Sequence, residues 1–216
     1  MIIYAVLVVI FSYLIGSVNF AVIFSKVFMK KDVRNIGSGN AGTTNIMRNG
    51  GFVPGALTFL CDALKGFVAS FAGKMVFDYI GSNADTWWAV PIYGAYICGV
   101  ACMLGHVFPL FFQFKGGKGV ATSVGIFAVC SPVAIVLGLT VFAIVTLTSK
   151  YVSVASVTAA VTVVVCSLIF RVSNAPIIPE IVMSVAMGLI VILKHIENMK
   201  RIIAGTESKI GDKKNG

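Results

Sequence analysis

Four long uncharged runs constrain the fold of this chain more than any other feature of its sequence. Residues 1–25, 86–114, 119–149 and 151–170 contain no Asp, Glu, Lys or Arg. A membrane-spanning helix needs roughly 20 apolar residues to cross about 30 Å of hydrocarbon, and 58% of all residues here are hydrophobic. These features exclude an ordinary soluble domain and predict an all-α integral membrane protein.

The basic residues fall between the apolar runs. Of the 17 lysines and arginines, all but Lys65, Lys74 and Arg171 lie in or beside polar breaks. The breaks cover residues 26–48, 115–118, 150 and 194–214. Basic loops close to membrane-spanning segments stay on the cytoplasmic side, so we expect these clusters to mark that face. The net charge of +9 suits an anionic leaflet or small anionic substrates better than nucleic acid.

The pattern predicts seven transmembrane helices, with the N-terminus outside and the C-terminus cytoplasmic. The first helix is retained and is not a secretory signal, because it lacks a charged n-region and a positive cluster follows it. The run 119–149 divides at Ser131-Pro132 into two short helices, since proline disfavours helix at the preceding residue. A single crossing there would place Lys150 and the basic tail outside. The expected helices cover about 3–25, 52–80, 87–112, the two halves of 119–149, 152–171 and 177–194, with a turn at 81–85.

This topology leaves little chain outside the membrane. We therefore expect one polytopic domain over residues 1–207 and a flexible cytoplasmic tail over 208–216. The five cysteines lie in apolar runs, where free cysteine behaves as a small hydrophobe. No Cys/His set has the spacing of metal ligands, so we expect no metal and no cofactor.

The first cytoplasmic loop, residues 35–48, combines glycines with neutral hydrogen-bonding side chains and one arginine. Its glycines let backbone amides point inward, and Arg48 adds a bidentate fork for an anion. Its candidate site residues are Ser38, Asn40, Thr43, Asn45 and Arg48. The alternative is a flexible polar linker.

The second loop contains Gly116, Gly117, Lys118 and Gly119, directly before an expected helix. Free backbone amides and the positive end of a helix dipole attract phosphate, and a lysine inside the turn adds charge. The spacing is not that of a Walker motif. The alternative is a positively charged turn that only sets topology.

The third cluster spans residues 194–207 and contains a histidine at the expected membrane surface. If the last helix continues, His195, Asn198 and Arg201 share one face. The histidine could be a base, a hydrogen-bond donor or an inert interfacial residue.

Two further sets of polar residues stand out. Residues 149–153 favour an anchored loop. Asp62 and Lys65 interrupt the second helix at positions i and i+3. Charges inside a span are costly and tend to pair, so they indicate either a functional cavity or a structural ion pair.

These segments resemble the acyl-phosphate-dependent glycerol-3-phosphate acyltransferase family of bacterial membranes. The matching segments are IGSGNAGTTNIMR at 36–48, GHVFPLFFQFKGGKGVATSVG at 105–125 and HIENMKRIIAGTE at 195–207, with support from YLIGSVNF at 13–20, DALKG at 62–66 and SKYVS at 149–153. The resemblance implies a seven-helix enzyme of the bacterial cell membrane, active on its cytoplasmic face. Such an enzyme moves an acyl chain from acyl phosphate to the 1-hydroxyl of glycerol 3-phosphate in phospholipid synthesis.

The resemblance also implies the site residues. Residues 116–119 would hold the acyl-phosphate head group. The implied catalytic residues are Ser38, Lys118, His195 and Asn198, and the implied substrate-binding residues are Asn40, Thr43, Asn45, Arg48, Gly116, Gly117, Gly119, Ser153, Arg201 and Glu207. The expected partners are acyl phosphate, glycerol 3-phosphate and membrane lipids, with no nucleic acid. Position 150 is more often arginine in such proteins; Lys150 keeps the charge but lacks the planar guanidinium fork, so we assign it no substrate role.

The chemistry of the residues agrees with an acyl transfer. No Ser-His-Asp set is evident, which favours direct attack by the hydroxyl over an acyl-enzyme. The proton could go to His195 or to a substrate phosphate oxygen. Neither histidine has the His-x4-Asp partner typical of acyltransferases that use acyl-CoA or acyl carrier protein.

A small-anion transporter and a non-catalytic membrane scaffold are the competing interpretations. A transporter typically has polar groups near the midplane, often on paired repeats, whereas the polar motifs here gather at one face. A scaffold would not need three separate loops suited to anions.

Overall fold

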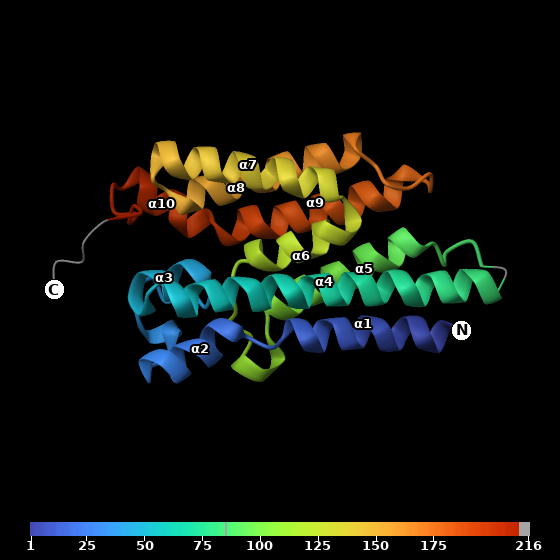
Figure 1. Ribbon diagram of the computed structural model, residues 1–216, viewed down its shortest axis with the longest axis horizontal. Coiled ribbons are helices and arrows are strands. Elements are labelled where there is room, and N and C mark those ends of the chain that lie inside the picture. The colour runs from blue at the N-terminus through green and yellow to red at the C-terminus, as the bar shows by residue number, and fades with distance from the viewer. Residues whose placement is uncertain (85, 212–216) are drawn as a thin grey trace.

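The computed structural model describes residues 1–84 and 86–211, and this part of the chain is helical without a strand. Its elements in order are α1 (Ile2–Gly16), α2 (Phe20–Met29), η1 (Val33–Asn35), α3 (Thr43–Gly50), α4 (Phe52–Asn83), α5 (Pro91–Val107), η2 (Leu110–Phe112), α6 (Val120–Cys130), α7 (Pro132–Ser149), α8 (Val152–Ile169), α9 (Ile177–Lys194) and α10 (Ile196–Ile203). The long helices run side by side along one axis (Figure 1).

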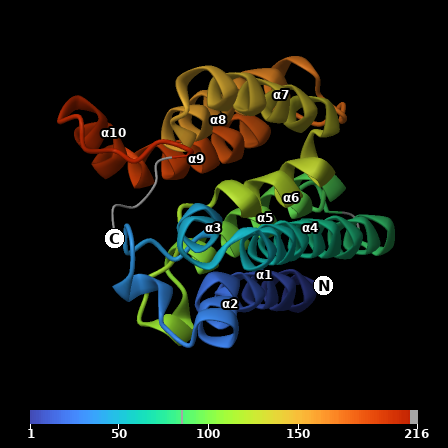
Figure 2. The ribbon, with the colours of Figure 1, turned by 60° about the vertical axis from the view of Figure 1, so that its left-hand side comes forward.

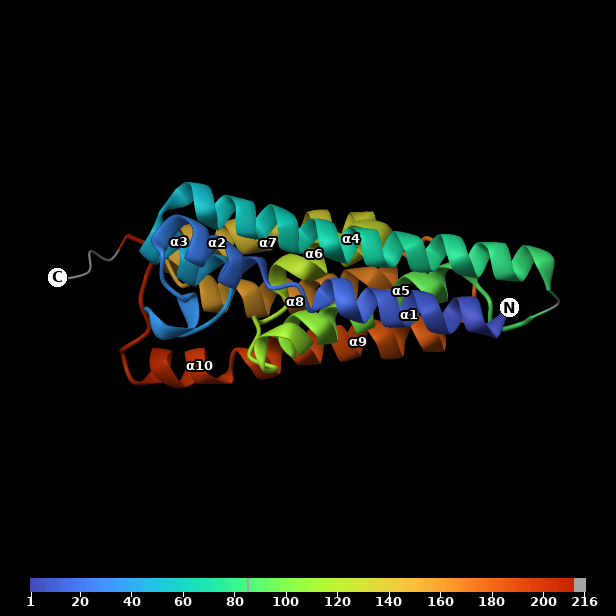
Figure 3. The ribbon, with the colours of Figure 1, turned by 90° about the horizontal axis from the view of Figure 1, so that it is seen from below.

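The helices form two groups with α6 between them (Figure 2). Helix α4 packs on α1, α5 and α6, while α8 packs on α7 and α9. Helices α2, α3 and α10 lie at the same end of the bundle, and Met1 lies at the other end (Figures 1 and 3). The polar loops predicted from the sequence therefore gather at one end of the molecule. The membrane side of each end stays a prediction.

Within the described residues, six helical segments are long and apolar enough to span a membrane: Ile2–Met29, Phe52–Asn83, Pro91–Phe112, Pro132–Ser149, Val152–Ile169 and Ile177–Lys194. The seventh expected helix is α6, which has only 11 residues. At 1.5 Å per residue it is roughly 16 Å long, about half the thickness of the hydrocarbon. Seven full spans are therefore not confirmed.

The expected division of the run 119–149 is confirmed. Helix α6 ends at Cys130 and Pro132 opens α7, with Ser131 between them in a non-helical conformation. The chain reverses direction there, so α7 returns toward the end of the bundle that holds α10 (Figure 1). Proline at the first helical position loses no intrahelical hydrogen bond, which suits this start.

The first predicted helix, 3–25, is wrong as one continuous helix, because it breaks between Gly16 and Phe20. Helix α2 has its own cap, since the Asn19 side chain accepts a hydrogen bond from Val22 N at 3.1 Å. A Cβ on Gly16 would collide with the Cys102 carbonyl. Helix α1 therefore packs closely on α5 at the residue where α1 ends.

Other boundaries also differ from the expectation. Helix α4 continues to Asn83 instead of ending near residue 80, and Asp85 of the predicted turn lies outside the described residues. Helix α5 begins at Pro91 and not at the tryptophan pair. Trp88 instead packs edge-on against Phe77 of α4, with ring centroids 5.8 Å apart. This contact holds the connection before α5 in a non-helical path.

Candidate functional site

The first loop folds around a single buried side chain, Asn45 of α3. Its amide nitrogen lies 2.9–3.1 Å from the carbonyl oxygens of Val33, Ile36 and Asn40. Its side-chain oxygen accepts a hydrogen bond from Ser38 N at 3.1 Å. The side chain of Asn45 is therefore occupied by hydrogen bonds that hold the first loop in shape. Helix α3 positions this side chain at the centre of the loop.

The second loop lies against the first loop and against the end of α5. Gly117 N donates to the His106 carbonyl at 3.2 Å. A Cβ on Gly117 would collide with the His106 ring and would lie 2.8 Å from the Ala41 carbonyl. Gly119 has a φ of +85° and precedes the first turn of α6. Glycine is required at these positions by close approach and by the left-handed backbone.

The third cluster is organised by His195, which lies at the joint between α9 and α10. The ring Nδ1 lies 2.8 Å from the Val191 carbonyl, which can only accept, so Nδ1 carries the hydrogen. The His195 backbone N–H bonds to Ile192 O instead. The ring N–H thus takes the place of the backbone N–H that would bond to the Val191 carbonyl in a continuing helix, and α9 ends there. The predicted end of the last span near residue 194 is confirmed, and Asn198 and Arg201 lie on the separate helix α10.

The second and third clusters meet in one hydrogen-bonded network. Lys118 Nζ donates to the side-chain oxygen of Asn198. The Asn198 amide donates to Glu207 Oε1 at 2.7 Å. Ser153, in the first turn of α8, donates to the same oxygen at 2.9 Å, while Arg201 Nε donates to Glu207 Oε2 at 2.8 Å. Glu207 therefore joins α8 and α10 and fixes the orientation of Asn198 toward Lys118.

The charges of this network are strongly perturbed. Burial lowers the pKa of Lys118 to about 8. The Glu207 carboxylate acts to raise this pKa, whereas the positive charges of Arg201 and Arg48 lower it further. Burial acts to raise the pKa of Glu207, but hydrogen bonds from Asn198, Arg201 and Ser153 outweigh it and hold that pKa below its usual range. Near neutral pH the site therefore presents an ammonium group beside an ionised carboxylate.

His195 is neutral in this setting. Burial and then the nearby Lys118 charge lower its pKa to about 4. Because Nδ1 carries the hydrogen, Nε2 keeps a free lone pair and can accept a hydrogen bond.

The chain after α10 crosses back over the site. Arg48 donates to the Ser208 carbonyl at 2.7 Å, and Ile210 N donates to the Lys150 carbonyl at 2.9 Å. These contacts bring the first loop and the α7–α8 connection to the segment that carries Glu207. Residues 212–216 of the predicted tail lie outside the described residues.

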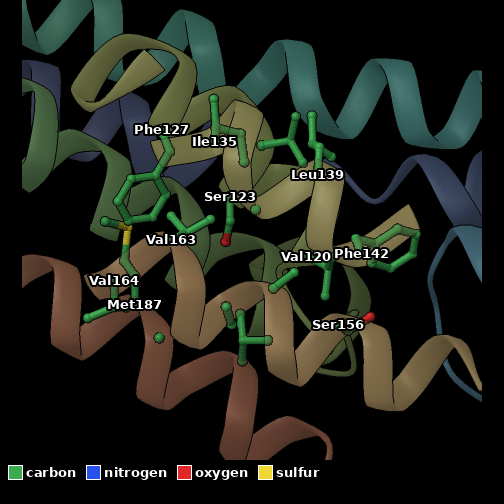
Figure 4. A pocket seen from close by; sticks show the side chains of 16 residues that line it. Val120, Ser123, Phe127, Ile135, Leu139, Phe142, Ser156, Val163, Val164 and Met187 are labelled. Carbon is green, nitrogen blue, oxygen red and sulfur yellow. The ribbon is translucent and has the colours of Figure 1, made fainter. Parts of the chain in front are cut away.

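An apolar pocket begins at Val120, close to this network. Figure 4 shows the side chains that line the pocket. It lies between α6, α7, α8 and α9 and has an empty volume of about 490 Å³, including its opening. Val120, two residues after Lys118, and Val191, whose carbonyl binds His195, both line it. Phe127 and Met187 line it farther along α6 and α9. An apolar pocket next to a cationic polar site is suited to an amphiphile with an anionic head.

Among the predicted site residues, the described interactions join Lys118, Asn198, Ser153, Arg201 and Glu207 directly. Gly116, Gly117 and Gly119 shape the loop that holds Lys118, and Arg48 reaches the same region through Ser208. Ser38 and Asn40 lie in the first loop, tied to Asn45, and the buried Thr43 hydroxyl has no hydrogen-bond partner within residues 1–84 and 86–211. Their roles toward a substrate stay predictions.

Sequence reasoning missed two features of this site. It did not identify the Val191 carbonyl that orients His195, because a backbone partner leaves no mark in residue types. It also left His106 without a partner, although Asp62 Oδ1 lies 3.5 Å from His106 Nδ1. The i, i+3 spacing of Asp62 and Lys65 was the only pointer to that cluster.

Comparisons with known proteins give a consistent picture. The family profile described as glycerol-3-phosphate acyltransferase matches residues 6–205. The chain is 42% identical to a glycerol-3-phosphate acyltransferase of Thermoanaerobacter sp. (strain X514), over 97% of this chain and 98% of that protein. It is 37% identical to one from Neisseria meningitidis (strain DSM 15465 / Z2491), over 94% and 96% of the two chains.

Two solved structures are also similar. One is PlsY (YgiH), an integral membrane glycerol 3-phosphate acyltransferase, in its glycerol 3-phosphate form, with a TM-score of 0.80 and 36% identity over 96% of each chain. The lysophosphatidic acid form matches with a TM-score of 0.76 and 35% identity, over 96% of this chain and 95% of that one.

Proposed function

The chain belongs to the glycerol-3-phosphate acyltransferase family, and from that premise we propose that it uses acyl phosphate as its acyl donor. The products are 1-acylglycerol 3-phosphate and inorganic phosphate, the first step of phospholipid synthesis. We further propose that the protein lies in the bacterial plasma membrane with its site on the cytoplasmic face. The clustering of basic residues at the end of the bundle that holds α10 supports this orientation.

One observation carries the proposal: the Lys118 network adjoins the apolar pocket. Lys118 and the loop amides other than that of Gly117, which donates to the His106 carbonyl, are suited to an anionic head group. The pocket beyond Val120 is suited to its acyl chain. The scissile carbonyl would then lie between Lys118 and the pocket mouth.

Glycerol 3-phosphate needs a second cationic contact, which we assign to Arg48 and Arg201. Arg48 is exposed and held by the Ser208 carbonyl, and Arg201 is held by Glu207. A guanidinium group binds phosphate bidentately. We place Ser38, Asn40 and Thr43 nearby as neutral donors to the same substrate, while Asn45 keeps the first loop in shape.

The transfer proceeds by direct attack of the C1 hydroxyl on the acyl carbonyl. The new ester C–O bond forms as the carbonyl carbon–phosphate oxygen bond breaks, and the departing phosphate takes the electron pair. Lys118 stabilises the charge on that phosphate. Holding the two reacting atoms about 3–3.5 Å apart supplies several kcal/mol of the barrier reduction.

The hydroxyl proton goes to the departing phosphate and not to His195. A histidine whose pKa is about 4 is a weak base near neutral pH, since efficient general bases have a pKa close to the working pH. The free Nε2 of His195 can still accept the hydroxyl hydrogen bond and aim the oxygen at the carbonyl. His195 and Asn198 are thus positioning groups in this mechanism.

The decisive test is donor competition with purified protein in proteoliposomes. Glycerol 3-phosphate should be acylated from acyl phosphate and not from acyl-CoA freed of acyl phosphate. Product from acyl-CoA alone would overturn the donor assignment. Uptake of labelled glycerol 3-phosphate without lipid product would favour a transporter.

A further inference from the structure

A buried charge cluster lies inside the bundle, and the proposed reaction uses none of its members. Asp62 and Lys65 of α4 form an ion pair with 2.7 Å between Oδ1 and Nζ, and their side chains are 1% and 2% exposed. Ionised groups inside a membrane span are costly to retain. A buried ion pair is also not explained by stability alone, because well-packed apolar residues in its place often give an equally stable protein.

Lys65 has a clear local role. Its Nζ donates to the Val18 carbonyl at 2.7 Å, in the break between α1 and α2. Asn19 takes the Val22 N–H that would otherwise pair with Val18 in a continuous helix. Lys65 therefore satisfies a carbonyl that the break would leave unpaired.

Asp62 faces a different partner, His106, at the end of α5. The Nδ1 atom of this 4% exposed ring lies 3.5 Å from Asp62 Oδ1. A carboxylate this close attracts a ring hydrogen on Nδ1 electrostatically. The opposite ring nitrogen, Nε2, is the atom that a Cβ on Gly117 would strike. The ring is thus fitted between the Asp62 carboxylate and the second loop.

His106 contacts the second loop with its backbone as well. Its carbonyl accepts from Gly117 N at 3.2 Å, and a Cβ on Gly116 would collide with that same carbonyl. Glycines give a loop close approach but no side chain to hold it in place, and an unfixed loop loses entropy when it binds. A rigid surface behind the loop lowers that cost.

We propose that Asp62 and His106 are positioning residues that hold the loop 116–119 in its phosphate-binding shape. Asp62 fixes the ring of His106, and the ring with its carbonyl fixes Gly117 next to Lys118. Lys65 balances the Asp62 charge. This inference rests on the proposed function in one respect: it takes acyl phosphate as the ligand of this loop.

Two matched double variants separate this role from that of a stabilising ion pair. Asp62→Asn with Lys65→Met removes both charges but keeps a side-chain oxygen for His106 Nδ1. Asp62→Leu with Lys65→Met removes that oxygen too. The Leu-containing variant should show a KM for acyl phosphate about tenfold above that of the Asn-containing variant, as expected for the loss of one close polar contact. The KM for glycerol 3-phosphate should be equal in the two.

Single variants give a second measurement if a double variant does not fold. His106→Leu should raise the KM for acyl phosphate, while His106→Asn, whose amide can replace Nδ1 toward Asp62, should raise it less. Cys98→Ala is the control, because Cys98 is fully buried on the same helix, two turns from His106. It should leave that KM unchanged.

A readout without turnover keeps the inference separate from the proposed function. Inorganic phosphate should raise the Tm of the wild type at lower concentration than that of His106→Leu. If the wild type acylates nothing but this difference persists, the proposed function fails and the positioning role stands. Equal KM values and equal phosphate responses in the matched pairs, or a loss in kcat alone, would overturn the positioning role.

Discussion

The pKa of Lys118 makes a sharp prediction about alkaline pH. With a pKa of about 8 in the free protein, the ammonium group is roughly 90% protonated at pH 7 and roughly 10% at pH 9. Only the protonated form binds phosphate, and substrate phosphates with a second pKa of about 6 are already ionised across this range. We therefore expect kcat/KM to fall about tenfold between these two values.

Lys118→Arg provides the matched variant, because a guanidinium group stays charged throughout this range. Its kcat/KM should be lower than that of the wild type but flat from pH 7 to pH 9. Lys118→Ala should be flat as well and reduced roughly 10- to 150-fold at pH 7, from a loss of about 1.5–3 kcal/mol per charge-assisted hydrogen bond.

The assay is formation of 1-acylglycerol 3-phosphate in proteoliposomes, with both substrates below their KM. A wild-type profile without a decline up to pH 9 would refute the assignment. A decline of the same size in Lys118→Arg would show that another group titrates.

Three further predictions concern the same site and its membrane placement. Glu207→Gln should move the alkaline midpoint of kcat/KM to lower pH, because the Glu207 charge raises the pKa of Lys118; an unchanged midpoint would contradict the network. His195→Gln should keep a substantial kcat with a raised KM for glycerol 3-phosphate, whereas inactivity at every pH would favour an obligatory base. In a cysteine-free background, single cysteines at the exposed positions Lys115 and Thr206 should react with an impermeant reagent from one side of the membrane and one at Asn174 from the other. Labelling of Lys115 and Thr206 from opposite sides would exclude a shared site.

The arrangement of the spans was predictable because its causes are local. Uncharged runs and the Ser131-Pro132 step indicated most helices, and the division at this step is confirmed by α6 and α7. The placement of the loops of Lys118 and Asn198 at one face was predicted from the basic clusters. These inferences needed only hydropathy, proline geometry and the position of charge, whereas a shared site for the two side chains was implied by the family resemblance.

The irregular points were not predictable, because each depends on a distant or a backbone partner. The break after Gly16 lies in a uniformly apolar run, and it is accompanied by Asn19 and by Lys65, which lies far along the chain. The joint at His195 depends on a ring-to-carbonyl bond that residue types do not reveal. Helix α3 is short and contains asparagine and glycine, which are poor helix formers.

The half-length of α6 connects these observations to the proposed reaction. Figure 1 shows α6 beginning well inside the ends of α4 and α8, so the loop before it lies deeper in the bundle than α3 or α10. A full-length helix would carry Lys118 out to the level of those helices and away from the apolar pocket that starts at Val120. A recessed loop lets an anionic head group meet Lys118 while its acyl chain stays among apolar side chains. The buried Asp62–His106 pair lies behind this loop. It supports the loop on the side where the glycines have no side chain to anchor them.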